Sequence, residues 1–387
     1  MKIGITCYPT YGGSGAVATE LGLELAERGH EIHFVSYAQP FRLGRFEERV
    51  YFHEVEMLPY PLFEYPPYSL ALAVSLHEVV EEHGLDLLHV HYAIPHATSG
   101  WITREMLEAE GSDVKLVTTL HGTDITLVGQ DPSFRSITRF SIVKSDGLTA
   151  VSRWLKEETC EAFGCQAERI RVIPNFIDPD VYRRDRYPCH RDALAPEGEK
   201  IVMHISNFRP VKRVADVVRI FGRIHQRVPA RLVMVGDGPE RQAASEAADE
   251  LGISDRVTFL GKVDSVAELL ACADLFLLPS EEESFGLVAL EAMSSGVPVV
   301  GTAGSGLAEV VADGETGFLH PVGAVEEMGE SGARLLEDPE LWSSFSEAAR
   351  RRAVEDFSAD RIVPRYERFY REVLAGEATR RAAEPLA

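Results

Sequence analysis

The chain has 387 residues, 45% apolar and 26% charged, so at about 150 residues per domain it is long enough for two or three domains. Its 61 acidic residues against 39 Lys and Arg give a formal net charge of -22, which repels nucleic acids and anionic membrane surfaces. Any anionic ligand therefore needs a local pocket of positive charge.

No stretch approaches the roughly 18 consecutive apolar residues of a membrane helix, and the N-terminal MKIGITCYP leads into a strand pattern rather than a signal peptide. We therefore expect a cytoplasmic protein with neither a membrane nor a nucleic-acid partner. The cysteines are odd in number and lack CxxC spacing, which favours reduced thiols over a disulfide framework or a zinc knuckle. They are Cys7, Cys160, Cys165, Cys189 and Cys272.

Short apolar runs alternate with amphipathic segments along the chain, a pattern typical of strand-helix-strand units around a parallel sheet. The first half predicts strands at residues 2–7, 31–37, 85–91, 115–120, 148–151 and 170–173. After the first strand, Val17, Leu21 and Leu25 recur at spacing four, as expected for the buried stripe of a surface helix.

The segment 174–196 interrupts this pattern with four prolines and no sustained period, which indicates a linker. Strands then resume at residues 201–205, 231–235, 257–260, 275–278, 297–300 and 317–319. We therefore predict an α/β protein with two doubly wound, Rossmann-like domains whose parallel sheets face a deep cleft. The expected boundaries are an N-terminal domain at 1–174, joined by a C-terminal helix at about 357–387, a hinge at 175–198 and a C-terminal domain at 199–356.

Ligands of open parallel sheets bind at the carboxyl ends of the strands. Gly12, Gly13, Ser14 and Gly15 follow the first predicted strand and directly precede the first helix. Glycines let the backbone approach an anion, and the helix start offers unpaired N–H groups, so this segment predicts a phosphate or carboxylate cradle. A tight turn selected for packing is the alternative. NAD binding is disfavoured, because the second strand ends in HFVSYAQ without the expected acidic residue.

Polar side chains follow two further strands of the first half. Residues 115–120 lead into His121 and Asp124, while residues 85–91 end in His89 and His91. An imidazole and a carboxylate at a strand's carboxyl end suit sugar recognition, although helix capping explains Asp124 equally well. A metal pair is disfavoured, because no third ligand stands at a characteristic spacing.

In the second half, the first strand leads into SNFRPVKR, in which three cations lie within five residues: Arg209, Lys212 and Arg213. In so acidic a chain, these cations match the positive pocket required above, although Arg213 alone is better explained as a solvated helix start. Farther on, the N–H groups of residues 284–287 offer a second anion cradle at a helix start. Glu291 lies inside that helix, where a carboxylate can accept ribose hydroxyls.

Taken in order, these motifs resemble the retaining nucleotide-sugar glycosyltransferases of the GT-B fold, the glycogen-synthase-like family four group. The resemblance covers essentially the whole chain through GGSG, PNFID at 174–178, the Lys212 segment, VGDGPE at 235–240, and the stretch between Glu283 and Glu291. ITCYPTYGGSGAVATELG, HVHYAIPHA, TTLHGTDIT, SNFRPVKR and EESFGLVALEAM are similar in particular to family members that open bacillithiol biosynthesis. The resemblance implies retaining transfer of N-acetylglucosamine from UDP-GlcNAc to the hydroxyl of L-malate, with no obligatory metal and no other cofactor.

Residue roles also follow from the resemblance. It implies three catalytic residues: His121 beside the donor sugar, Lys212 at the pyrophosphate and Glu283 at the sugar hydroxyls. Many relatives carry Arg where this chain has Asn207, so Arg209 is expected to supply the second cation. The implied donor-binding residues are Gly13, Ser14, Gly15, Asn207, Arg209, Lys212, Ser284, Phe285, Gly286, Leu287 and Glu291.

Malate carries two carboxylates, so its site needs cations from the first domain. Arg135 and Arg139, in the helix predicted after HGTDIT, are the preferred candidates, with Tyr92 and Thr119 as hydrogen-bond donors. Arg104, Lys144 and Arg153 are equally explained as solvated surface charges.

Three rival functions stay open at this point. One is a related UDP-sugar transferase acting on inositol phosphate, a lipid or a glucan. A second is a UDP-GlcNAc 2-epimerase, which would need acid and base groups around the sugar instead of an acceptor site. The third is a non-catalytic nucleotide-sugar sensor. The sequence also leaves open whether the protein is a homo-oligomer.

Overall fold

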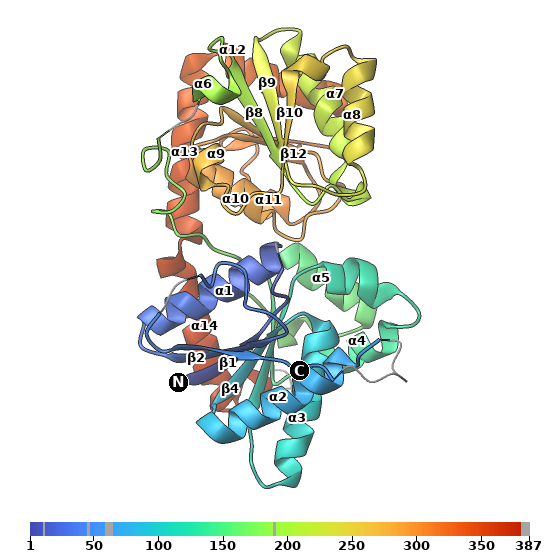
Figure 1. Ribbon diagram of the computed structural model, residues 1–387, viewed down its shortest axis with the longest axis vertical. Coiled ribbons are helices and arrows are strands. Elements are labelled where there is room, and N and C mark those ends of the chain that lie inside the picture. Colours follow the sequence, from blue (N-terminus) through green and yellow to red (C-terminus); the bar gives the residue numbers. More distant parts are fainter. Residues whose placement is uncertain (11, 45–46, 59–64, 189–190, 381–387) are drawn as a thin grey trace, which may run out of the picture. The chain divides into compact units, whose positions relative to one another are not determined.

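The chain folds as two units, each built around its own parallel sheet. The computed structural model describes residues 1–10, 12–44, 47–58, 65–188 and 191–380. The first unit comprises Met1–Asn175 with Ile362–Ala387, and the second comprises Phe176–Arg361. Figure 1 shows helices on both faces of each sheet, as a doubly wound fold requires.

The sheet of the first unit has the strand order β3-β2-β1-β4-β5-β6-β7 and is parallel throughout. Its strands are β1 Lys2–Thr6, β2 Glu31–Ser36, β3 Val50–Glu54, β4 Leu87–His91, β5 Lys115–Leu120, β6 Gly147–Ala150 and β7 Ile170–Val172. All six strands predicted for this half are confirmed. The edge strand β3 escaped prediction, because its sequence VYFHE has a run of only three hydrophobic residues, none of which is fully buried.

The helices of the first unit are α1 Gly13–Glu27, α2 Tyr68–His83, α3 Thr98–Ala109, α4 Arg135–Lys144, α5 Arg153–Phe163, α14 Ala359–Leu374 and α15 Glu377–Arg380. The predicted stripe of α1 is confirmed, since Val17, Leu21 and Leu25 are fully buried. Short helical turns lie at Ala93–Ala97, Thr123–Leu127, Val128–Gln130 and Ala167–Arg169. The helix α14 packs into this unit from far along the chain, with Tyr366 and Tyr370 fully buried.

The second sheet has the order β10-β9-β8-β11-β12-β13. Its strands are β8 Lys200–Ile205, β9 Ala230–Val235, β10 Val257–Gly261, β11 Leu275–Leu278, β12 Val299–Thr302 and β13 Gly317–His320. The helices are α6 Arg191–Leu194, α7 Val214–His225, α8 Arg241–Glu250, α9 Ala267–Leu270, α10 Leu287–Ser294, α11 Leu307–Val310, α12 Val325–Glu337 and α13 Pro339–Phe357, with short turns at Pro210–Lys212 and Ser254–Arg256. All six strands predicted for this half are confirmed.

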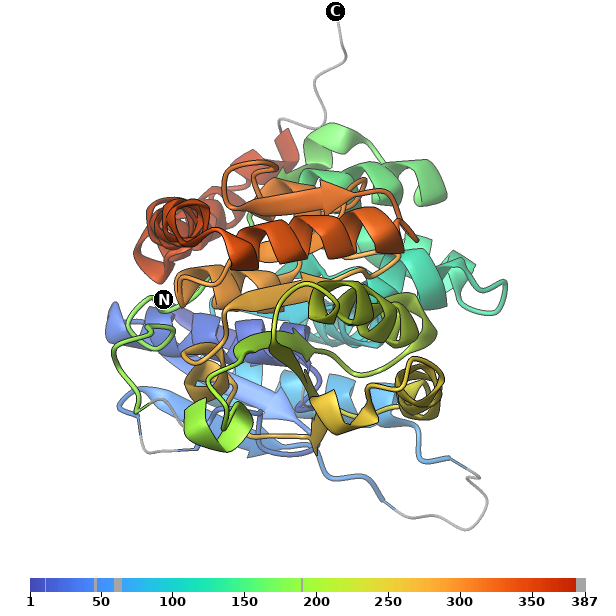
Figure 2. The ribbon, with the colours of Figure 1, turned by 90° about the horizontal axis from the view of Figure 1, so that it is seen from above.

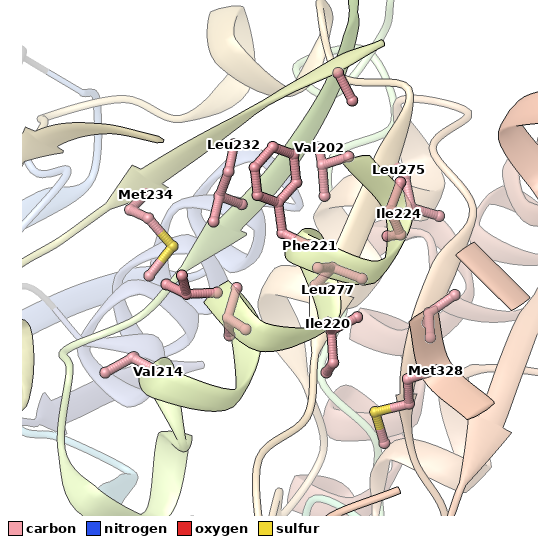
Figure 3. Close-up of a cluster of buried hydrophobic side chains, with 14 of the residues drawn as sticks. Val202, Val214, Ile220, Phe221, Ile224, Leu232, Met234, Leu275, Leu277 and Met328 are labelled. Atoms are coloured by element: carbon pink, nitrogen blue, oxygen red, sulfur yellow. The ribbon is translucent and has the colours of Figure 1, made fainter. Parts of the chain in front are cut away.

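The core of the second unit lies between its sheet and α7. Figure 3 shows Phe221 and Ile224 of α7 among Leu232, Val202 and Leu275 of the strands, and all five side chains are fully buried. The helix α12 packs alongside α7 (Figure 2), and its Met328 belongs to the same buried cluster. This packing holds α7 firmly on the sheet, and with it the loop between β8 and α7.

The segment expected to be a linker packs onto the second unit. Tyr182 is buried, and Arg184 donates to the carbonyl oxygens of Ala273 and Ser295. A guanidinium nitrogen of Arg191 lies 2.7 Å from Asp274 Oδ2. The described residues between Phe176 and Leu194 are therefore built into this unit through specific contacts.

Two global expectations can be compared with the structure. Cys7, Cys160 and Cys165 carry free thiols, but Cys272 is disulfide-bonded, so the expectation of reduced thiols is wrong at that position. Cys189 lies outside the described residues. No helix in the described part of the chain is long and apolar enough to span a membrane.

Candidate functional site

In each sheet the strand order reverses beside a central strand, at β1/β4 in the first unit and at β8/β11 in the second. Ligands of doubly wound folds bind at the carboxyl ends of the strands at such positions. The segments singled out from the sequence follow β1, β4, β5, β8 and β11, so each unit gathers its candidate residues at this edge.

The glycine-rich segment after β1 contains one closely packed glycine and two exposed ones. A Cβ on Gly15 would lie 2.6 Å from the carbonyl oxygen of Tyr8, so close packing explains this glycine. Gly12 and Gly13 are exposed, and a Cβ on Gly12 would meet nothing within 4 Å. The helix α1 begins at Gly13 without a side-chain cap, so its first N–H groups are suited to an anion.

Asp124 ties the ends of β4 and β5 together beside His121. Its buried carboxylate accepts hydrogen bonds from the backbone N–H groups of Ala93 at 2.9 Å, Gly122 at 3.0 Å and His121 at 3.2 Å. Burial raises the pKa of Asp124 to about 6, while these N–H groups oppose the rise. The carboxylate thus fixes the loop that carries His121.

His121 is a buried, neutral imidazole. Its Nε2 lies 2.8 Å from Nδ1 of His91, and its ring centroid lies 5.2 Å from that of Tyr92. Burial lowers the pKa of His121 to about 3, and the nearby His96 adds to this effect. Tyr92 is held at a positive φ of 86° and also contacts Tyr8, with ring centroids 5.4 Å apart. The structure therefore brings the predicted residues His121 and Tyr92 together.

Thr119 has a different environment from the one expected of an acceptor ligand. It is fully buried, and its Oγ1 lies 2.7 Å from His89 Nε2 and 2.7 Å from Thr149 Oγ1. The hydroxyl of Tyr370 on α14 completes this chain, 2.7 Å from His89 Nδ1. Sequence analysis missed Tyr370, since nothing in the α14 segment links it to β4.

Arg135 and Arg139 both lie against the last turn of α5. Arg135 donates to the carbonyl oxygen of Ala162 at 2.7 Å, and Arg139 donates to that of Phe163 at 3.1 Å. Cations stabilise a helix C-terminus, where carbonyl groups lack helical partners. These contacts give both guanidinium groups a structural role in joining α4 to α5.

In the second unit, Lys212 and Glu283 form a close pair. Lys212 Nζ lies 2.6 Å from Glu283 Oε1, and the two side chains are only 20% and 10% exposed. The N–H of Glu281 donates to the carbonyl oxygen of Val211, which holds the loop after β11 against the loop after β8. An ammonium group has three donors, so the bond to Glu283 leaves donors for an anion.

Two glycines of the VGDGP motif support the loop after β8. A Cβ on Gly236, whose φ is 116°, would lie 1.8 Å from the carbonyl oxygen of Ser206, and one on Gly238 would lie 2.1 Å from that of Asn207. Only glycine permits this approach. Asn207 and Arg209 of the supported loop are exposed, whereas Arg213 is paired with Asp216, as expected for a helix start.

The start of α10 forms the second predicted anion cradle. Gly286 adopts a φ of 89°, and α10 begins after it without a side-chain cap or an acidic residue in its first turn. Phe285 and Gly286 are buried, while Ser284 and Leu287 are half-buried. A Cβ on Gly306 would lie 2.1 Å from the carbonyl oxygen of Ser284. A glycine at position 306 therefore leaves room for the turn that precedes α10.

Glu291 is buried on α10, and its Oε1 accepts a hydrogen bond from the hydroxyl of Tyr182 at 2.7 Å. Tyr182 is a residue that sequence reasoning missed, because it falls in the proline-rich segment predicted to be a linker. Among the described residues, the site of the second unit thus combines the Lys212–Glu283 ion pair, a helix N-terminus and an oriented carboxylate.

Comparisons with known proteins identify the class. The model of "Glycosyltransferase Family 4" matches residues 11–181, and that of "Glycosyl transferases group 1" matches residues 188–352. The chain belongs to this family of glycosyltransferases, with the GT-B fold of two Rossmann-like units. The family, the fold and the enzyme class predicted from the sequence are confirmed.

One relative is much more similar to this chain than membership of the same family requires. The chain is 51% identical over 375 residues to N-acetyl-alpha-D-glucosaminyl L-malate synthase of Bacillus anthracis, covering 97% of both proteins. It is 31% identical to D-inositol 3-phosphate glycosyltransferase of Nocardia farcinica, covering 80% of this chain and 73% of that protein. Among solved structures, Anabaena Alr3699/HepE in complex with UDP-glucose has a TM-score of 0.77 at 23% identity, covering 97% of this chain and 99% of that one.

Proposed function

We propose that this protein transfers N-acetylglucosamine from UDP-GlcNAc to the hydroxyl of L-malate with retention at the anomeric carbon, which is the first step of bacillithiol biosynthesis. The observation that carries the proposal is the 51% identity to the synthase of that name over 97% of both chains. The site chemistry supports a diphosphate donor, because cations and helix starts gather in a chain whose net charge is -22.

In this proposal the second unit holds the donor. Lys212, Arg209 and the first N–H groups of α10 neutralise the pyrophosphate, and Asn207 adds a polar contact. Gly13, Ser14 and Gly15 of the first unit are the further candidates for binding a phosphate, through the first N–H groups of α1. Glu291 binds the ribose hydroxyls, since a carboxylate accepts several hydrogen bonds and the hydroxyl of Tyr182 orients this one. Glu283 orients the sugar while its charge is balanced by Lys212.

The proposed reaction is a same-face substitution. Glu283 is engaged with an ammonium group, which suits it to binding hydroxyls rather than to acting as a nucleophile. The departing β-phosphate takes the proton of the malate hydroxyl, while Lys212 stabilises the negative charge on the phosphate. Because His121 stays neutral, it can hydrogen-bond to the sugar without adding positive charge beside an oxocarbenium-like transition state. The chemistry requires no resident metal or other cofactor.

For the acceptor, Tyr92 is the candidate best supported by its contact with His121. Thr119 would act from a buried position, through the hydrogen bonds that orient the end of β4. Arg135 and Arg139 remain candidates for the malate carboxylates. The variants Arg135→Gln and Arg139→Gln separate the roles: a higher KM for malate at unchanged stability supports binding, whereas lower stability at unchanged KM supports capping of α5.

The test is an acceptor panel. Purified protein is incubated with UDP-GlcNAc and one of a series of hydroxy acids and polyols, and UDP release and product mass are followed. L-malate is expected to give rapid UDP release and a product of the combined mass. If malate gives no more UDP than the control without acceptor while another alcohol does, the malate assignment is wrong and the transferase class stands.

The panel also tests two alternatives. Inositol 3-phosphate belongs in it, because the Nocardia farcinica relative is named for that acceptor at 31% identity. Incubation with the donor alone tests the 2-epimerase, which would consume UDP-GlcNAc without an acceptor. A transferase leaves most of the donor intact under this condition.

A further inference from the structure

Three histidines that the proposed reaction does not use meet at one end of the first sheet. His33 lies on β2, His53 on the edge strand β3, and His83 is the last residue of α2. Their ring centroids lie 5.2 Å, 4.5 Å and 5.2 Å apart for the pairs 33/53, 33/83 and 53/83. One ring nitrogen of each lies within 4.8 Å of the other two, as a shared metal ion would need.

This trihistidine cluster is separate from the candidate active site of the same unit. Lys2 and Glu31, the first residues of β1 and β2, adjoin it through the Lys2–Glu31 ion pair and the Glu31–His33 contact. The cluster therefore lies on β2 and the edge strand β3, with Lys2 and Glu31 beside it. His121 follows the carboxyl end of β5, which is three strands away from β2 in the order β2-β1-β4-β5.

Glu31 sets the tautomer of His33. Its Oε1 lies 3.1 Å from His33 Nε2, so this nitrogen carries the proton and Nδ1 keeps a lone pair. A carboxylate behind an imidazole is the arrangement that orients histidine ligands in metal sites. The lone pair of His33 Nδ1 faces His53 Nε2 at 2.9 Å, inside the cluster.

The spacing of these two nitrogens is close to that of ligands on one ion. Two imidazole nitrogens on a tetrahedral zinc ion lie about 3.3 Å apart, since each Zn–N bond is about 2.0–2.1 Å. A side-chain shift of about 0.4 Å would therefore turn the His33–His53 contact into two metal bonds, with the proton of His53 moved to its Nδ1. Side chains adjust by this amount without backbone rearrangement.

Metals bind the neutral form of imidazole, through a ring nitrogen that keeps its lone pair. The charged groups around the cluster are Glu31, Lys2 and Glu82, whose Oε2 lies 4.0 Å from His83 Nε2.

We propose that His33, His53 and His83 bind a divalent transition-metal ion, and that zinc is the ion that fits them best. Three neutral imidazoles suit zinc, which takes four ligands, and the fourth position falls to water or to Glu82. The ion joins β2, β3 and the end of α2. Because β3 is an edge strand whose sheet partner among the described residues is β2, this site ties that edge to the rest of the unit.

The test is zinc titration of the full-length chain without a histidine tag, after chelator treatment, in competition with a chromophoric chelator. The wild-type protein is expected to bind one zinc ion, and zinc is expected to raise its Tm. His53→Gln and His83→Gln should each weaken binding by at least about 100-fold, and Glu31→Gln by about 10–100-fold. A wild-type protein that binds zinc no more tightly than His53→Gln overturns the proposal.

A matched control comes from a second group of potential ligands. His77, Glu81 and Glu110 also lie within ligand distance of one another, at a more exposed position. His77→Gln should leave the zinc affinity and the Tm shift unchanged. If His77→Gln abolishes the tight site while His53→Gln keeps it, the ion binds elsewhere and the proposal is wrong.

Cobalt(II) substitution identifies the donor atoms. The trihistidine cluster predicts the visible absorption of four-coordinate cobalt without a thiolate charge-transfer band, and His83→Gln should lose it. A thiolate band would place the metal on cysteine, and the pale spectrum of six-coordinate cobalt would exclude the proposed geometry. Either result contradicts the proposal.

Discussion

At the scale of single residues, the pair of Lys212 and Glu283 is the feature on which the proposed donor chemistry depends most. Both groups are largely buried and lie 2.6 Å apart, so each balances the charge of the other. The Lys212 ammonium is therefore already largely desolvated and held in position by Glu283 before a diphosphate binds. Such preorganised donors act on the transition state without further reorganisation.

Lys212→Ala is predicted to lower kcat by about 10²–10³-fold, the usual cost of removing one charge-stabilising donor. Arg213→Ala is the matched control, because Arg213 is the next residue and pairs with Asp216. Circular dichroism and steady-state kinetics on both variants check the expectation. Similar activity of the two variants would remove Lys212 from its assigned role.

Asp124 illustrates a residue whose part in the fold could not be derived from sequence. Capping of a following helix was one explanation, but the carboxylate accepts N–H groups from both the β4 and the β5 loops. In Asp124→Asn, an amide NH2 replaces one acceptor and faces an N–H donor. We predict a loss of about 1–3 kcal/mol in unfolding free energy and a lower kcat through displacement of His121. Urea denaturation and kinetics measure both, and wild-type values in each would refute the role.

At the scale of elements, the sequence predicted the twelve strands with continuous or alternating apolar runs, because burial on both faces leaves a strong pattern. The edge strand β3 has no fully buried position and a hydrophobic run of only three residues, so its pattern was too weak to predict a strand. The segment predicted to be a linker shows a different limit of sequence analysis. Its prolines indicated irregular backbone correctly, but they carry no information about which unit Tyr182, Arg184 and Arg191 pack against.

The part of the candidate site that could be predicted from the sequence is the part that lies in local motifs. Lys212, Glu283 and the start of α10 lie at strand ends and carry characteristic neighbours, so their region was evident. The contacts of Arg135 and Arg139 with α5, and those of Tyr370 with His89, are long-range and leave no local pattern.

Tyr182→Phe tests the contribution of the segment before α6. The variant keeps the ring packing and removes the hydroxyl that donates to Glu291. If Glu291 binds ribose, loss of this orienting bond should raise the KM for UDP-GlcNAc several-fold and leave the KM for malate unchanged. Equal changes in both constants, or none, would argue against that role.

At the scale of the whole molecule, buried histidines make stability depend on pH. Burial lowers the pKa of His96 and His204 to about 4 and that of His89 and His121 to about 3. Between these values and the unfolded value near 6.5, the unfolded chain binds more protons, so stability is complete above about pH 6.5 and is lost as the pH falls. Asp124 acts in the opposite sense between about pH 4 and 6, because its folded pKa is raised.

The net prediction is a urea midpoint that falls steadily from pH 7 to pH 5. His204→Gln removes one titrating group. It should reduce the slope of the unfolding free energy against pH by up to about 1.4 kcal/mol per pH unit. The slopes of the two proteins are compared under identical salt. A midpoint independent of pH over this range would contradict the burial of uncharged histidines.

The most direct measurement of the central claim is the NMR spectrum of the product made from UDP-GlcNAc and L-malate. We expect N-acetylglucosamine joined through its anomeric carbon to the malate hydroxyl oxygen, with the small H1–H2 coupling of an α linkage and one UDP released per product. A β-linked product, or recovery of unmodified malate beside hydrolysed or epimerised sugar, would contradict the account.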